Sequence, residues 1–141
     1  MGRLEGMTEE LWANARNMVL KANWLRGHYL IDHPDAREWV VSSGRRTPDV
    51  NARIRGAAPR SNHLTCNALD ISDIDRSIAR WMFANLHHLA ELDLWMEDPR
   101  CTPTWAHIQT VPPLSRNRVF IPSADWAKRL AGQTLTLGSI R

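Results

Sequence analysis

Two residues of the segment 61–71 could bind a metal ion. His63 offers an imidazole nitrogen and Asp70 a carboxylate oxygen, with six residues between them. A catalytic zinc site takes three protein ligands and leaves one position open for water, so this pair predicts a third ligand elsewhere in the chain. His107, in Trp105-Ala106-His107, is the candidate. The alternative interpretation of the pair is a surface histidine and an aspartate that caps a helix.

The strand that would carry Asp70 follows from the alternation of apolar and polar residues. In residues 67–72, Leu69 and Ile71 fall on one side of a strand and Asp70 on the other. Asp70 would therefore point away from the apolar face, toward a cleft. His63 would lie on the loop that enters this strand.

The strand that would carry His107 is expected to pair with its predecessor. Residues 92–97 and 104–110 read as an antiparallel pair joined by a turn. If the polar faces of the two strands coincide, Glu97 and His107 both reach the cleft. Further extended segments are expected at 39–43 and 117–122.

Three helices are predicted from apolar residues at helical spacing. The first covers residues 8–25, begins at Thr8 as its N-cap, and is expected to stop before Gly27. The other two are expected at residues 75–90 and 123–130.

Three polar residues beside the second helix are expected to have local roles. Asp73 is read as a cap at its start rather than as a metal ligand. His87 and His88 are adjacent, so on a helix their side chains project about 100° apart and cannot readily share one metal ion. We interpret both as helix-end residues favoured by the helix dipole.

The composition indicates one hydrophobic core. A chain of 141 residues with 43% hydrophobic residues is typical of a single domain, which we place at residues 1–141. Most of the seven tryptophans are expected in that core. Together these elements predict an α+β fold in which a small antiparallel sheet packs with helices, and we expect a monomer.

Charge and hydropathy disfavour two other classes of protein. The formal charge is +3, but the basic residues are scattered and do not form a strip with aromatic residues, as a nucleic-acid-binding face would. No apolar run reaches membrane-spanning length, and residues 1–6 lack the apolar core of a signal peptide. We therefore expect synthesis in the cytoplasm, so that action outside the cell would need another route, such as host lysis. Two cysteines, Cys66 and Cys101, cannot define a disulfide-rich scaffold.

Three ordered motifs resemble those of a known family. They are Ser43-Gly44-Arg45-Arg46-Thr47-Pro48, Ser61-Asn62-His63 followed by Ala68-Leu69-Asp70, and Trp105-Ala106-His107. The patterns S-G-x-R-(S/T)-P, S-x-H-x-x-x-x-A-x-D and W-x-H are similar to those of peptidase family M15, the zinc D-Ala-D-Ala carboxypeptidases and L-Ala-D-Glu endopeptidases. The similarity covers roughly residues 40–122.

The resemblance implies a zinc peptidase fold of the hedgehog and DD-peptidase type. It also implies that His63, Asp70 and His107 hold Zn²⁺ and that the substrate is a peptidoglycan peptide. Arg46 matches the family arginine, and a guanidinium there suits a substrate carboxylate or an oxyanion. The neighbouring Arg45 is as easily a solvated surface residue.

The chain departs from the family pattern at two positions. Many members have an acid three residues before the second histidine, where this chain has Thr104. Our candidate for the missing base is Glu97, with Asp98 as the alternate. The family usually has glycine where this chain has Cys66, so the backbone there is expected to differ, and we read the thiol as a small buried group. Ser61 and Gln109 are expected to hydrogen-bond the substrate.

Three functions remain open at the level of sequence. The first is a zinc peptidase that cleaves peptidoglycan stem peptides, acting on the cell wall as a phage lysin after release or as part of a virion. The second is a catalytically silent zinc-binding module of a virion or wall-associated assembly, suggested by Thr104. The third, a basic nucleic-acid binder, rests on the pI near 9.4 alone.

Overall fold

The first helix is longer than the spacing of its residues predicted. The computed structural model describes residues 6–141, and in it α1 runs from Glu9 to Asp32. The predicted N-cap is confirmed, because Oγ1 of Thr8 accepts a hydrogen bond from the backbone N–H of Leu11 at 3.2 Å. The predicted end at residue 25 is wrong. Glycine costs a helix only about 1 kcal/mol, and the helix continues through Gly27 so that Tyr29 joins the core.

Five strands form one sheet in the order β1-β2-β4-β3-β5. All neighbours pair antiparallel except β3 and β5, which run parallel. The α+β class is confirmed. The sheet is mixed and not purely antiparallel, because β5, which follows β4 in the chain, pairs in parallel with β3. The strands are β1 (Val41–Ser43), β2 (Ala68–Ser72), β3 (Trp95–Glu97), β4 (Trp105–Gln109) and β5 (Val119–Phe120).

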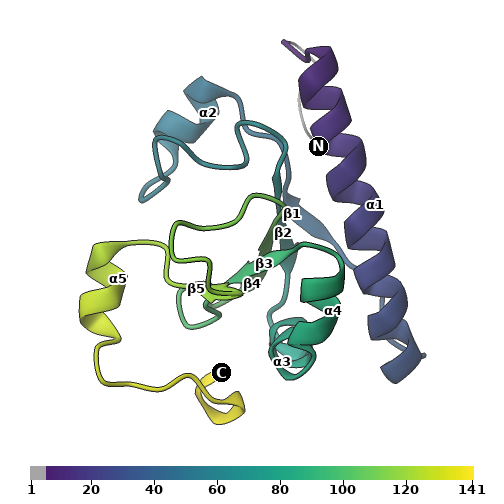
Figure 1. The fold of residues 1–141 in the computed structure, drawn as a ribbon, viewed down its shortest axis with the longest axis vertical. Coiled ribbons are helices and arrows are strands. Elements are labelled where there is room, and N and C mark those ends of the chain that lie inside the picture. The colour runs from purple at the N-terminus through teal and green to yellow at the C-terminus, as the bar shows by residue number, and fades with distance from the viewer. Residues whose placement is uncertain (1–5) are drawn as a thin grey trace.

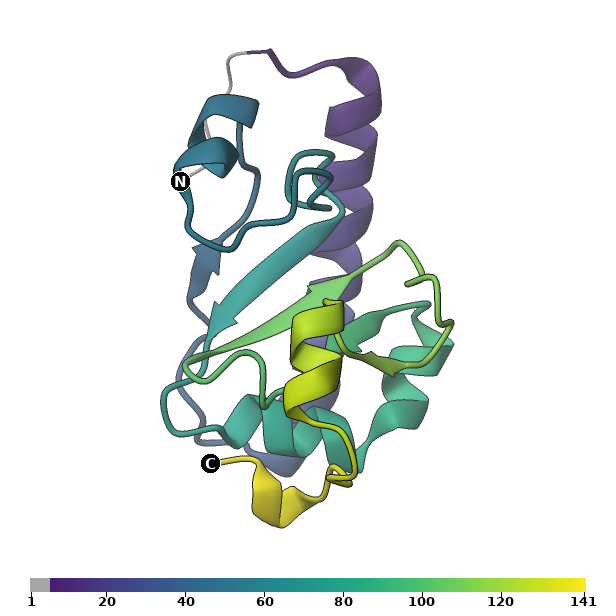
Figure 2. The ribbon, with the colours of Figure 1, turned by 90° about the vertical axis from the view of Figure 1, so that its left-hand side faces the viewer.

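The helices divide the sheet into two unlike faces. Figure 1 shows α1, α3 (Ser77–Ala84) and α4 (Leu86–Glu91) on one side of the sheet and α5 (Ala124–Arg129) on the other. Figure 2 shows the strands running diagonally with α1 behind them. Ile71, Met96 and Ile108 are buried in the core with residues of the three helices. The opposite face carries the polar residues Asp70 and His107.

The helix expected at residues 75–90 is two helices. The chain leaves helical geometry at Asn85, where φ is −130° and ψ is 44°. Both carboxylate oxygens of Asp73 accept backbone N–H groups at the start of α3, from Ile78 and Ala79 at 2.9 Å each. The prediction that Asp73 serves the helix start is therefore confirmed.

The strand expected from residue 92 begins only at Trp95, because Asp93 adopts φ +51° in a turn. The tryptophans also differ from the expectation of core positions. Trp81 is 6% exposed, whereas Trp12 and Trp24 on α1 are 42% and 61% exposed.

The remaining elements of the described residues are α5, α2 and a short 3₁₀ helix near the C-terminus. The predicted last helix is confirmed as α5, whose N-cap Ser123 accepts from the N–H of Trp126. The helix α2 (Pro48–Arg53) follows β1, and a short 3₁₀ helix at Leu137–Ser139 precedes the buried Ile140.

None of the helices in residues 6–141 combines the length and apolar character that crossing a membrane requires. Residues 1–5, part of the segment in which no signal peptide is expected, lie outside the described residues.

Candidate metal centre

The three candidate ligands come together on the polar face of the sheet. Asp70 on β2 and His107 on β4 are directly opposite partners, so their side chains point to the same face. Nδ1 of His107 lies 2.8 Å from Oδ1 of Asp70, and Nε2 of His63 lies 3.2 Å from Oδ2. One ligand atom from each of the three residues lies within 4.8 Å of the others, and all three residues are buried.

His63 is held by the first motif of the chain. Its Nδ1 lies 2.7 Å from the carbonyl oxygen of Gly44, and its own carbonyl accepts the N–H of Arg46 at 3.0 Å. Because a carbonyl only accepts, Nδ1 carries a proton, and Nε2 is the ring nitrogen that faces Asp70. The loop after β1 thus sets both the ring orientation and the tautomer of His63.

His107 is oriented by Gln109, two residues further along β4. Oε1 of Gln109 lies 2.9 Å from Nε2 of His107, and Nε2 of Gln109 donates to the carbonyl of Val111 at 2.7 Å. The amide oxygen must therefore accept the His107 Nε2–H, so Nδ1 is the atom available toward Asp70. Metal-binding histidines commonly have their second nitrogen engaged in this way. This contact differs from the expected one, in which Gln109 would bind substrate.

In the absence of a cation, the charge of Asp70 is balanced by its neighbours. Burial alone would raise its pKa, but hydrogen bonds from His107 and His63 hold the pKa of Asp70 well below its usual range. Burial alone would likewise lower the pKa of His107, and the hydrogen bond to Asp70 raises it. A divalent cation would replace the proton on His107, because both occupy the same lone pair. Two imidazoles and a carboxylate fit Zn²⁺ in donor type, number and proximity.

Arg46 also contacts the candidate centre. Its Nη2 donates to Oδ2 of Asp70 at 3.2 Å, and its Nε donates to Oγ of Ser43 at 3.1 Å. The family resemblance predicts that this guanidinium holds a substrate carboxylate or an oxyanion. The structure instead shows it bound to a ligand carboxylate, and substrate contact by Arg46 stays a prediction.

Glu97 is placed beside the ligands by the strand register. Met96 pairs with Ile108 in β3 and β4, so the next residue on β3, Glu97, lies opposite His107. Burial raises the pKa of Glu97 to about 7, and the nearby His107 counteracts part of this shift. Burial thus favours the protonated form of Glu97.

Asp98, the alternate base, is occupied elsewhere. Its carboxylate accepts from Nη2 of Arg100 at 2.7 Å and from Nε at 3.0 Å. It also follows Glu97 directly in the chain, and successive residues of a strand point to opposite faces. The geometry therefore favours Glu97 over Asp98. Thr104, at the family's usual acid position, is exposed just before β4.

Ser61 forms hydrogen bonds within the loop that carries His63. Its Oγ accepts the backbone N–H of His63 at 3.3 Å. The carbonyl of Gly44 was not predicted from the sequence, whereas Gln109 was predicted as a site residue but contacts His107. A backbone carbonyl leaves no signal in residue type, whereas the spacing of Gln109 on the face of His107 could have suggested its role.

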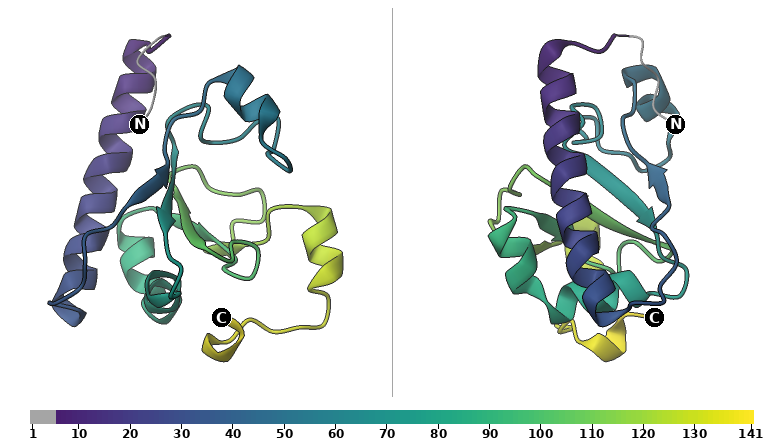
Figure 3. Two further views of the ribbon diagram at one scale, coloured as in Figure 1. Left: turned by 180° about the vertical axis from the view of Figure 1, so that it is seen from behind. Right: turned by 90° about the vertical axis from the view of Figure 1, so that its right-hand side faces the viewer.

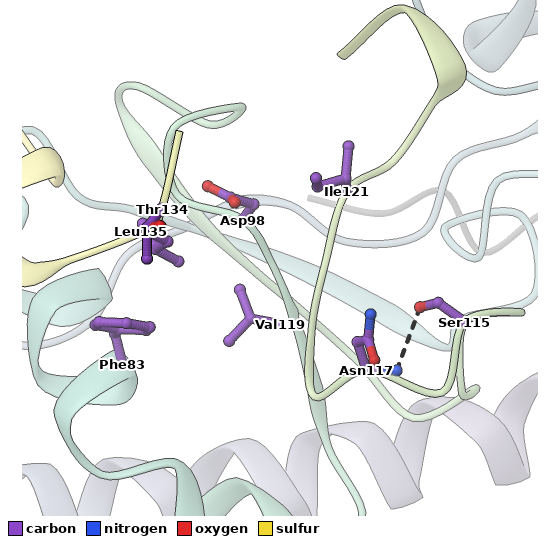
Figure 4. A pocket seen from close by; sticks show the side chains of 8 residues that line it. All are labelled: Phe83, Asp98, Ser115, Asn117, Val119, Ile121, Thr134 and Leu135. Carbon is purple, nitrogen blue, oxygen red and sulfur yellow. Dashed lines mark hydrogen bonds between the residues drawn. The ribbon is translucent and has the colours of Figure 1, made fainter. Parts of the chain in front are cut away.

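A pocket of about 400 Å³ lies on the other side of the sheet (Figure 4). Val119 shares the face of Met96, its pairing partner in β3, and so lies on the core side. None of the candidate ligands lines this pocket, and we assign it no part in the metal centre. Its lining residues are Phe83, Asp98, Ser115, Asn117, Val119, Ile121, Thr134 and Leu135.

The fold and the site together define a class of protein. Two imidazoles and a carboxylate on the polar face of the sheet form a donor set used by zinc hydrolases. Residues 8–98 match the family model of peptidase M15, so the chain belongs to this family, as its motifs predicted. The matched range includes His63, Asp70 and Glu97 and ends before His107. No curated protein and no solved structure gives a significant match to the chain.

Proposed function

We propose that this chain is a zinc-dependent peptidase that cleaves peptidoglycan stem peptides, either by trimming a terminal D-Ala or by cutting between L-Ala and D-Glu. Membership of peptidase family M15 supports a hydrolase of peptide bonds. The observation that carries the proposal is the convergence of His63, Asp70 and His107, with the second nitrogen of each imidazole engaged by another group.

Three side chains would hold the ion. They are His63 through Nε2, His107 through Nδ1 and Asp70 through its carboxylate. Bound there, Zn²⁺ would polarise the scissile carbonyl and lower the pKa of a water molecule to about 7. Arg46 holds Asp70 in place through Oδ2 and adds positive charge at the edge of the centre.

Glu97 is the residue proposed to move the proton. An ionised carboxylate there would accept the proton of the attacking water and pass it to the leaving amine. In the metal-free chain burial raises the pKa of Glu97 to about 7, a value at which a carboxyl group can both accept and release a proton near neutral pH. Ser61, half-buried on the loop beside His63, is proposed to hydrogen-bond the substrate.

The wider setting is also part of the proposal. We propose a single domain over residues 1–141 that works as a monomer on a peptidoglycan peptide and does not bind nucleic acid. A phage lysin that reaches the wall after release, or a virion component, is the biological setting proposed for it.

A catalytically silent zinc-binding module is the second candidate. Thr104 favours it, because the position that carries an acid in many relatives holds an exposed hydroxyl group. In that case the centre would bind zinc and peptide without turnover, and Glu97 would be a buried residue without a catalytic task.

The test is digestion of purified peptidoglycan, with mass analysis of the products and zinc content measured for every sample. Wild type is expected to release peptide fragments whose masses identify the bond, and Glu97→Ala is expected to keep its zinc and lose turnover. Glu10→Ala, an exposed glutamate on α1, is the matched control and is expected to cut like wild type. Zinc-loaded wild type that cuts nothing from pH 5 to 9 would overturn the peptidase proposal in favour of the silent module.

A further inference from the structure

A second group of potential ligands lies on the other face of the sheet. His28 on α1 and His88 and Glu91 on α4 each offer one ligand atom, and these atoms lie within 4.8 Å of one another. His88 and Glu91 are three residues apart on a helix, so their side chains project to the same side. The ring centroids of His87 and His88 lie 4.1 Å apart, but the second imidazole of this group comes from His28 on α1.

The central histidine of this group has an unsatisfied nitrogen. Nδ1 of His88 is buried and has no hydrogen-bond partner among residues 6–141, and it lies 3.9 Å from Oε2 of Glu91. A buried polar atom without a partner is costly, and an ion is one of the species that satisfies it. Burial and the neighbouring imidazoles of His28 and His87 lower the pKa of His88, which favours the neutral ring. A neutral imidazole is the form that binds a metal.

The ring of His88 is held in place by aromatic neighbours. It stacks on Trp81 at a centroid distance of 5.7 Å and on His28 at 4.0 Å. Trp81 is itself fixed, because its Nε1 donates to Oδ2 of Asp32 at 2.7 Å. The planes of the His28 and His88 rings are inclined to each other by 18°, so the rings are almost parallel. Their in-plane lone pairs would therefore meet at one ion only if the half-buried His28 ring tilted.

We propose that His28, His88 and Glu91 form a second binding site for a divalent transition-metal ion of the zinc type, which fastens α1 to α4. Two imidazoles and a carboxylate suit zinc and its neighbours better than calcium or magnesium. Figure 3 shows α1 running across the outside of the molecule, on the side away from α5. Because the ion would link two helices, the role of this site is structural. The site does not depend on the peptidase activity proposed for the opposite face.

The experiment measures Zn²⁺ binding to chelator-treated full-length protein by equilibrium dialysis and calorimetry. Wild type is expected to bind two ions, and His63→Asn, which lacks a ligand of the first centre, is expected to keep one tight site. Adding Glu91→Gln to His63→Asn is expected to weaken that remaining site more than about 100-fold, because even partners of ligands contribute 10–100-fold to affinity. Adding Glu10→Gln, which removes the same charge elsewhere on the surface, is expected to leave it unchanged.

A second readout separates loss of binding from loss of folding. Glu91 is exposed, so Glu91→Gln without metal is expected to melt at the wild-type temperature. Zn²⁺ is expected to raise the melting temperature of His63→Asn but not that of His63→Asn with Glu91→Gln or with His28→Asn. A single zinc ion per wild-type chain that is lost in His63→Asn, or an unchanged second site in the Glu91→Gln variant, would overturn the proposal.

Discussion

His107 and Asp70 face each other across β2 and β4, with Nδ1 of His107 2.8 Å from Oδ1 of Asp70. The same register continues in both directions across the sheet. Ser43 on β1 pairs with Asp70, Glu97 on β3 lies opposite His107, and Phe120 on β5 pairs with Glu97. One row of side chains from all five strands thus carries two candidate ligands and the candidate base, and rigid backbone pairing fixes their spacing.

The position of Glu97 in this row predicts a selective loss of activity. Glu97→Gln keeps the size of the side chain but cannot accept a proton, so the turnover number is expected to fall about 10²–10⁴-fold. Zinc content is expected to stay at the wild-type level. Asp98→Asn is the comparison, since Asp98 pairs with Arg100, and turnover per folded molecule should change less than tenfold. Equal losses in the two variants would remove the basis for choosing Glu97.

The raised pKa of Glu97 predicts a pH-dependent difference in stability. Burial shifts this pKa from its ordinary value of 4.5 to about 7, so the metal-free folded state holds the proton more tightly than the unfolded state does. The contribution of protonated Glu97 to the free energy of unfolding is complete below about pH 4.5 and is lost as the pH rises through 7. At 1.36 kcal/mol per pKa unit, the loss is up to about 3 kcal/mol.

Glu97→Gln does not titrate and should escape this loss. Relative to wild type, the metal-free variant is expected to gain stability between pH 4.5 and pH 8. Urea unfolding of both chelator-treated proteins at the two pH values measures the change. A stability difference that is the same at both values would show that Glu97 has an ordinary pKa.

The contact between His107 and Gln109 predicts a role in metal affinity. Gln109→Ala removes the acceptor that fixes the tautomer and orientation of His107, and zinc affinity at this centre is expected to fall about 10–100-fold. Competition with a chromogenic chelator gives the dissociation constant. Gln133→Ala, a glutamine of the exposed C-terminal segment, is the control and should bind zinc like wild type. Full affinity in Gln109→Ala would return Gln109 to the substrate role expected from sequence.

The backbone conformation of Cys66 predicts the order of stability of three variants at this position. Cys66 adopts φ +60°, the left-handed region, which costs residues other than glycine about 1–2 kcal/mol. Glycine, the usual family residue here, adopts this conformation more easily than any other residue, and a difference in backbone from other members stays a prediction. The side chain is buried, as expected for the thiol, and burial raises its pKa.

Three substitutions at this position separate strain from burial. Cys66→Ala loses the buried sulfur and keeps the strain, whereas Cys66→Gly loses both, so the glycine variant is expected to be about 1 kcal/mol more stable than the alanine variant. Cys66→Val should be the least stable, because a β-branched side chain fits the left-handed region poorly. Urea unfolding gives the order, and an alanine variant as stable as the glycine variant would contradict it.

Local elements were predictable where their signals are local. Thr8 and Ser123 act as N-caps and Asp73 binds the start of α3, because each bond spans only a few residues. The boundaries at Gly27 and Asn85 were not predictable from spacing. Whether a helix continues past a weak residue depends on the burial of the residues beyond it, and that is a property of the packed molecule.

For the site, residue types and their order in the sequence determined the candidate ligands His63, Asp70 and His107 and the membership of family M15. Only the tertiary structure decided the strand register that sets Glu97 opposite His107, the carbonyl of Gly44 behind His63, and the approach of His28 to His88. The physical reason is that side-chain chemistry belongs to single residues. The distance between residues far apart in the chain is set by how the sheet pairs and how the helices pack on it.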